Sequence, residues 1–140
     1  MTFSNLEKCK LIDLPRVRDT RGSLSFIENG ENMPFSIQRL YYIYDVPGGE
    51  SRGAHAHKEL MQIIIAMSGS FQVELTDGAN TKSFTLSTPY VGLFVDKLIW
   101  RNLKNFSSGA VCAVLASMKY DESDYIRDYE KFLSGEMKND

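Results

Sequence analysis

Residues 49–69 read GESRGAHAHKELMQIIIAMSG, and this stretch decides the fold. It holds the only two histidines of the chain, His55 and His57, one residue apart and followed by Gln62. Side chains two positions apart in an extended strand point to the same face, so both imidazoles can belong to one site. The apolar run at 63–67 is too short to span a bilayer and predicts a buried strand instead.

Short apolar or alternating runs recur along the rest of the chain, separated by Gly, Pro, Asn and Asp, as is typical of sandwiches and barrels. The segments predicted as strands are residues 10–14, 24–28, 38–46, 61–67, 69–76, 81–87, 92–95 and 111–118. A turn at 76–80 predicts a hairpin between two of them. Near the C-terminus, Asp121 or Ser123 can cap a helix that Gly135 ends, so we expect a helix over about 121–134.

Composition limits the classes of protein to consider. With 140 residues and 43% hydrophobic content, the chain (1–140) can form a single domain with one core. Its formal net charge of −2 comes without charged blocks, so nucleic acid is not an expected partner. No apolar leader or span appears, which favours a cytoplasmic protein without membrane contact. Cys9 and Cys112 form no motif, and neither a disulfide nor a metal is assigned to them.

The spacing of two glycines, two histidines and Gln62 within residues 49–69 resembles the first motif of the cupin superfamily, whose fold is a double-stranded β-helix, or jelly-roll, barrel. In that motif a carboxylate ligand, usually Glu, stands where this chain has Gln62. The second motif of metal-binding cupins adds a histidine, but the matching region 92–103, GLFVDKLIWRNL, has none. Two imidazoles, one amide and water suit a first-row metal ion poorly, so no metal is expected. Proton transfer is favoured over two purely structural histidines, because an imidazole titrates near neutrality.

A closer resemblance rests on four segments, which are DTRGSLSFIEN (19–29), PFSIQRLYYIYDVPGGESRGAHAHK (34–58), VGLFVDKLIW (91–100) and YDESDYIRDYEKF (120–132). Together they resemble the sugar 3,4-ketoisomerases that act on dTDP-4-keto-6-deoxyglucose. The resemblance implies a homodimeric cupin isomerase that needs no metal or other cofactor. It further implies that the product passes to a PLP-dependent aminotransferase making 3-amino-3,6-dideoxy sugars for surface polysaccharides, such as O-antigen, or S-layer glycans.

Moving a ketone from C4 to C3 requires a base at C3, stabilisation of an enediolate and a proton donor at C4. The resemblance implies that His55 is the base, and His57 can orient the substrate or shuttle protons. Either Tyr41 or Tyr42 can donate a hydrogen bond or a proton, since strand parity lets only one of them face the interior. Tyr41 is slightly preferred, because it shares a face with Arg39.

Cationic side chains complete the expected site. Arg21 and Arg52 are fixed charges that can hold the C3 and C4 oxygens while negative charge develops. Arginine and lysine side chains must also bind the diphosphate, because the chain has no Gly-rich phosphate loop. The residues expected to bind substrate or nucleotide are Arg39, Arg52, Tyr42, Lys58 and Gln62.

Two positions bear on the configuration of the product at C4. Some members of the family have a histidine after the tryptophan at 100 and others an arginine; Arg101 leans toward the gluco product, because arginine cannot supply a proton. Arg21, however, stands where galacto-type enzymes tend to have arginine. Both are expected in the catalytic site, and the stereochemistry stays open.

Three other functions are compatible with the barrel. A dTDP-sugar 3,5-epimerase has a related fold, but such chains are typically longer and pair a histidine with an aspartate and a tyrosine. A non-catalytic cupin that binds a sugar or another ligand is the second alternative. A metal-dependent oxygenase is the third, and the missing ligands count against it.

Overall fold

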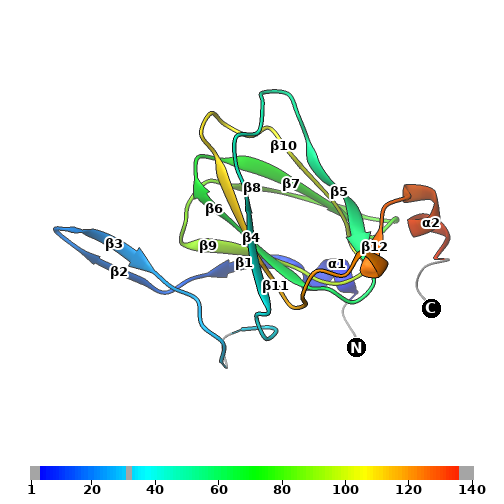
Figure 1. Cartoon of the computed structure of the whole chain (residues 1–140), viewed down its shortest axis with the longest axis horizontal. Coiled ribbons are helices and arrows are strands. Elements are labelled where there is room, and N and C mark those ends of the chain that lie inside the picture. Colours follow the sequence, from blue (N-terminus) through cyan, green and yellow to red (C-terminus); the bar gives the residue numbers. More distant parts are fainter. Residues whose placement is uncertain (1–3, 31–32, 136–140) are drawn as a thin grey trace.

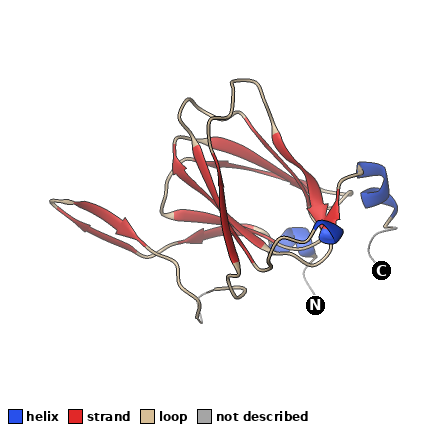
Figure 2. Ribbon diagram, viewed as in Figure 1, coloured by secondary structure: helices blue, strands red, loops and turns tan. Residues whose placement is uncertain are grey.

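Two antiparallel five-stranded sheets face each other and enclose the core, as Figures 1 and 2 show in the computed structural model, which describes residues 4–30 and 33–135. One sheet has the order β1-β9-β6-β11-β4, the other β12-β5-β10-β7-β8, and β2 pairs only with β3. The strands are β1 (Lys10–Asp13), β2 (Arg16–Asp19), β3 (Gly22–Ser25), β4 (Arg39–Ile43), β5 (Arg52–His57), β6 (Gln62–Ser68), β7 (Phe71–Thr76), β8 (Thr81–Leu86), β9 (Val91–Val95), β10 (Trp100–Lys104), β11 (Val111–Ala116) and β12 (Tyr125–Ile126). The helices are α1 (Asn5–Lys8), the 3-10 helix η1 (Glu122–Asp124) and α2 (Tyr129–Ser134). The expected all-β jelly-roll barrel with a short C-terminal helix is confirmed.

Strand β6 shows why a continuous apolar run forms a strand here. It lies between β9 and β11, with Ile64 opposite both Leu93 and Val114. Its inner face joins the main core through Ile64, while Ile63 belongs to a second apolar cluster on the outer face of the sheet. Because both faces are covered, the strand is apolar at consecutive positions rather than at alternate ones.

A β-bulge shapes β5, the strand that carries both histidines. Across the β5–β10 pair, His55 lies opposite Arg101 and Arg52 lies opposite Leu103. These two pairs are three positions apart on β5 and two positions apart on β10, so β5 contains one extra residue. Gly53 takes up the distortion with a φ of 79°, in the left-handed region that favours glycine. Strict alternation would put Arg52 and His55 on opposite faces, and the bulge instead lets both line one cavity.

The expected helix over about 121–134 is wrong in its first half. Asp121 caps only the 3-10 turn η1, and β12 then pairs with β5, with Tyr125 opposite His57. This pairing satisfies the backbone groups that a continuous helix would have used internally. Helix α2 begins after Asp128, which accepts hydrogen bonds from two backbone amides, and it ends at Gly135 as expected.

The β2–β3 hairpin projects away from the barrel (Figure 1), and every residue of both strands is exposed. The strand expected at 24–28 corresponds to β3, which begins two residues earlier, at Gly22, and ends three residues earlier, at Ser25. Strands β2, β5, β10 and β12 were not among the predicted strands.

Both cysteines are buried free thiols, and burial raises the pKa of Cys112 to about 12. Within residues 4–30 and 33–135, no helix has the length and apolar character that crossing a membrane requires.

Candidate active site

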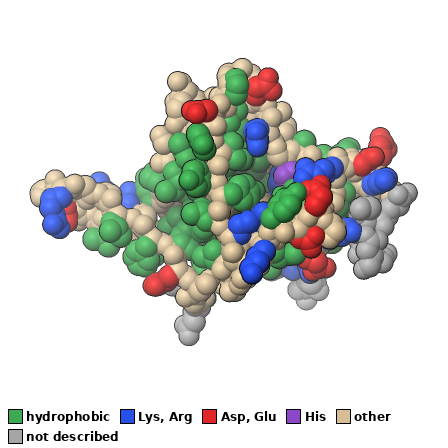
Figure 3. Space-filling model, viewed as in Figure 1, with side chains coloured by type: hydrophobic (Ala, Val, Ile, Leu, Met, Phe, Trp, Pro, Cys, Tyr) green, Lys and Arg blue, Asp and Glu red, His purple; other side chains and the backbone are tan. Residues whose placement is uncertain are grey.

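An open cavity of about 700 Å³ lies between the two sheets, at the end where β5, β10 and the C-terminal segment meet. Strands of both sheets and the segment after η1 contribute to its walls. Polar side chains on its surface include Arg39, Tyr41, His55, Gln62, Arg101 and Arg127. Figure 3 shows histidine atoms reaching the surface beside a group of Lys and Arg side chains.

Three polar side chains, two of them buried, form a chain of hydrogen bonds in the cavity. The Arg101 guanidinium donates to the Gln62 side-chain oxygen and, at 3.0 Å, to the backbone oxygen of Ile99. The Gln62 amide in turn donates to the Tyr41 hydroxyl oxygen at 2.9 Å. Because that oxygen already accepts, the Tyr41 O–H is free to donate to a ligand. Burial lowers the pKa of Arg101 to about 10 and raises the pKa of Tyr41, so one stays charged and the other protonated at neutral pH.

His55 carries the basic nitrogen of the cavity. Its Nε2 atom is buried and has no hydrogen-bond partner within residues 4–30 and 33–135. Burial first, and then the charges of Arg101 and Arg127, lower the pKa of His55 to about 3. The ring is therefore neutral at neutral pH and can accept a proton.

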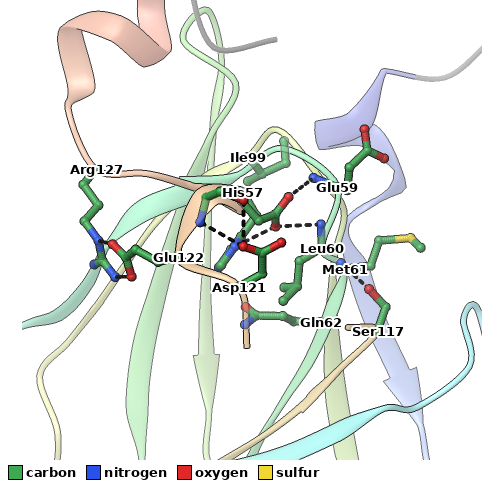
Figure 4. Close-up of polar contacts among 12 residues, drawn as sticks. His57, Glu59, Leu60, Met61, Gln62, Ile99, Ser117, Asp121, Glu122 and Arg127 are labelled. Atoms are coloured by element: carbon green, nitrogen blue, oxygen red, sulfur yellow. Dashed lines mark hydrogen bonds and ion pairs between the residues drawn. The ribbon is translucent and has the colours of Figure 1, made fainter. Parts of the chain in front are cut away.

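His57 lies behind His55 and does not line the cavity. Its side chain has no exposed surface, and its ring stands nearly perpendicular to the His55 ring, with centroids 4.8 Å apart. Its Nδ1 atom lies 3.2 Å from the carboxylate of Asp124, in the buried polar group around His57 that Figure 4 draws. Burial and the charge of Arg101 lower the pKa of His57 to about 2. The expected direct contact of His57 with substrate is therefore not supported by its position.

Unpaired cationic donors belong to two arginines that line the same cavity as His55. Arg39 Nε and Nη2 and Arg101 Nε are buried and have no hydrogen-bond partner in the part of the chain that the structure describes. The Arg39 guanidinium lies 5.2 Å from the centroid of the Tyr41 ring. Buried donors of positive charge without partners suit an anionic ligand, because leaving them unpaired is costly.

Some expected site residues lie elsewhere. Arg21 is at the tip of the β2–β3 hairpin, with its side chain 89% exposed and paired with Asp19 at 2.8 Å, so within one chain it does not reach this cavity. Lys58 is not on the cavity wall. Tyr42 and Arg52 are exposed and border the cavity, whereas Tyr41 points inward, as the strand parity favoured.

The C-terminal segment supplies site residues that the sequence did not single out. Tyr125 and Arg127 line the cavity, and the Arg127 guanidinium lies over the Tyr125 ring at 4.1 Å. Glu122 holds Arg127 through two hydrogen bonds of 2.8 and 3.0 Å, as Figure 4 shows. The motif YDESDYIRDYEKF belongs to the family resemblance and could have indicated site residues here. Its helical spacing was interpreted instead as a helix, with no role in a site.

The cavity residues do not fit a metal ion. Within residues 4–30 and 33–135, no three His, Cys, Asp or Glu side chains are grouped to hold one. The Gln62 oxygen, at the position of the usual cupin carboxylate, accepts from the Arg101 guanidinium. A second cation at that oxygen would meet the charge of Arg101 at close range.

Comparison with known proteins gives consistent matches over most of the chain. Residues 7–137 match the family model described as FdtA: WxcM-like, C-terminal. A TDP-4-oxo-6-deoxy-alpha-D-glucose-3,4-oxoisomerase of Aneurinibacillus thermoaerophilus is 49% identical over 123 residues, 88% of each chain.

Solved structures agree with these matches. A 3,4-ketoisomerase from Helicobacter canadensis is 50% identical, with a TM-score of 0.88, over 95% of this chain and 98% of that chain. A histidine-to-asparagine mutant of the 3,4-ketoisomerase QdtA from Thermoanaerobacterium thermosaccharolyticum, in complex with TDP-4-keto-6-deoxyglucose, is 38% identical, with a TM-score of 0.89. That match covers 94% of this chain and 95% of the other.

Proposed function

This chain belongs to the FdtA family (WxcM-like, C-terminal), and on that premise we propose that it is an isomerase that converts dTDP-4-keto-6-deoxyglucose to the 3-keto sugar. One observation carries the proposal. Neutral His55, whose Nε2 has no partner, lines the same cavity as Arg39 and Arg101, whose side chains carry unpaired donors. A base beside fixed cations is what proton abstraction next to a ketone requires.

The reaction moves two protons and no net electrons. His55 Nε2 takes the proton from C3, and the electron pair of that C–H bond moves toward the C4 oxygen, giving an enediolate. Arg101, Arg39 and the free O–H of Tyr41 stabilise the negative oxygens through charge and hydrogen bonds. A proton is then added at C4 while the proton of the C3 hydroxyl passes to the C4 oxygen, so the ketone ends at C3 and the hydroxyl at C4.

Nucleotide binding is assigned to the cavity mouth. Arg52 and Tyr42 lie there, brought to the cavity by the bulge at Gly53 and by the edge strand β4. Arg52 is exposed and carries a charge that can pair with diphosphate oxygens in a bidentate manner. Arg39, deeper in the cavity, is the second candidate for the phosphate nearer the sugar.

Proton NMR of the protein with dTDP-4-keto-6-deoxyglucose in heavy water tests the proposal. We expect loss of the C3 proton signal and a new 3-keto species without added metal. Trapping that species with a PLP-dependent sugar aminotransferase, which we propose as the next enzyme, would give the configuration at C4. Exchange at C5 would favour a 3,5-epimerase, and dTDP binding without any exchange would favour a non-catalytic cupin.

We further propose that two copies of the chain form a homodimer through the face that carries the β2–β3 hairpin. A two-stranded hairpin is marginal alone, and Val17 and Leu24, paired across it, are 56% and 57% exposed. Beside the hairpin, hydrophobic side chains gather on the outer face of the barrel (Figure 3), around a groove lined by Leu40 and Met67 among others. Light scattering should give about twice the 15.9 kDa of one chain.

A further inference from the structure

Asp124 contacts the more buried of the two imidazoles, that of His57, and the reaction steps above give it no role. Its side chain is 6% exposed and accepts from the backbone amides of Glu59 at 2.8 Å and Leu60 at 3.2 Å. Its third neighbour is His57 Nδ1, at 3.2 Å from Oδ2. In Figure 4, dashed lines from His57, Glu59 and Leu60 converge on one carboxylate, that of Asp124.

The hydrogen-bond inventory of this cluster fixes where the His57 proton lies. Both carboxylate oxygens already accept from backbone amides, which favours the ionised form of Asp124, although burial raises its pKa. An ionised carboxylate can only accept, so His57 Nδ1 must be the protonated nitrogen of a neutral ring. His57 Nε2 is then a bare lone pair, and it is buried with no partner within residues 4–30 and 33–135.

The His57 ring in turn sets the surroundings of His55. The two rings are in edge-to-face contact, and the Tyr125 ring packs on both, with centroid distances of 5.1 Å to His55 and 4.4 Å to His57. The other tautomer of His57 would replace a lone pair by an N–H group inside this cluster. Because the two rings are in contact, a change of that kind would shift the position of the His55 ring.

We propose that Asp124 is a positioning residue for the ketoisomerase reaction, which holds the His57 proton on Nδ1 and thereby fixes the His55 ring for proton abstraction at C3. The proposal rests on the proposed function for its catalytic half. A purely structural Asp124 would only join β5 to the C-terminal segment, and its backbone oxygen already does so by accepting from the Lys58 amide at 2.9 Å.

The test begins with the wild-type protein. The chain has only two histidines, so long-range proton–nitrogen NMR spectra of the nitrogen-labelled protein, compared with those of His55→Asn, assign both rings. We expect His57 to be protonated on Nδ1. Protonation on Nε2 instead would overturn the proposal without any variant of Asp124.

Asp124→Asn provides the kinetic half of the test. An amide still accepts one backbone hydrogen bond but can offer an N–H to His57, which allows the other tautomer. We expect the His57 spectrum to change, kcat to fall roughly 10- to 100-fold, and the Kd for dTDP to stay within about twofold. Asp124→Glu restores the carboxylate and should recover part of kcat. Asp121→Asn, in the same turn but exposed, is the matched control and should keep wild-type kcat.

The outcomes distinguish failure of the positioning role of Asp124 from failure of the proposed function. A folded Asp124→Asn protein with wild-type kcat would overturn the positioning role. Should Asp124→Asn fail to fold by circular dichroism, Asp124→Glu decides, since a loss of kcat with unchanged His57 tautomer would show a structural role only. Absence of C3 exchange in the wild type would instead refute the proposed function, while the tautomer measurement still tests the Asp124–His57 bond.

Discussion

Replacing His57 with Asn is expected to make the protein less sensitive to acid. His57 has no exposed surface, and burial together with nearby charge lowers its pKa from 6.5 to about 2. The ring stays neutral in the folded protein, whereas in the unfolded chain it takes up a proton below its ordinary pKa. Acid therefore favours the unfolded state, and the free energy of unfolding falls as the pH drops below about 6.5 toward the folded-state pKa.

The size of the effect follows from proton linkage. Between pH 7 and pH 5 the unfolded ring goes from mostly neutral to mostly charged, which lowers the free energy of unfolding by about 2 kcal/mol for one such histidine. Asn cannot titrate, and its side-chain N–H can replace the donor that His57 Nδ1 offers to Asp124. Asp124 is present in both proteins, so its own titration largely cancels in the comparison.

Urea unfolding at pH 7, 6 and 5, at one fixed protein concentration because the protein is proposed to be a dimer, measures the effect. The wild type should lose about 2 kcal/mol more than His57→Asn between pH 7 and pH 5. Lys82→Gln, on β8 away from the histidines, is a control that should keep the wild-type dependence on pH. Equal pH dependence in wild type and His57→Asn would refute the assignment of a neutral, buried His57.

Three further changes test the site and the proposed dimer. His55→Asn should keep dTDP binding while turnover, followed by C3 exchange in heavy water, falls roughly 100-fold or more; equal loss of binding would indicate a structural histidine. Gly53→Ala should lower stability to urea by about 1–2 kcal/mol, because φ is 79° and the new Cβ would lie 3.2 Å from Leu103; unchanged stability would contradict the bulge. Leu24→Asp should give a monomer in light scattering, whereas Thr85→Asp, also exposed but on β8, should not; a dimeric Leu24→Asp protein would exclude the hairpin face.

The strands that the sequence predicted are those whose side chains follow the ordinary hydrophobic rules. β6 and β11 each hold a run of buried apolar residues, and β7 alternates between fully and partly buried residues. β10 escaped prediction because one of its two inward positions holds Arg101, 2% exposed, where the pattern of a strand requires an apolar residue. A buried charge breaks the hydrophobic pattern, and here it does so at the candidate site.

The sequence pointed to several residues that line the cavity but not to those that the C-terminal segment brings from far along the chain. His55, Gln62 and Tyr41 share short motifs with clear strand parity, and the structure places all three at the cavity. Asp124 reaches His57 across 67 positions of sequence, through a two-residue strand with too few residues for any periodicity to identify it. For Arg21, the turn motif contains no information on whether its hairpin folds back onto the barrel, and in one chain it does not.

The low pKa of His55 is compatible with its proposed role because the reaction changes the charge of the cavity. In the empty site, burial and the charges of Arg101 and Arg127 oppose protonation of the ring. When the C3 proton moves to His55, a negative enediolate forms at the same time and faces the unpaired donors of Arg39 and Arg101. The new anion offsets the cations that had lowered the basicity of the ring, so base and anion stabilise each other in the transition state. The same cations would oppose the charged ring before the substrate binds, and this keeps His55 neutral and ready to accept the proton.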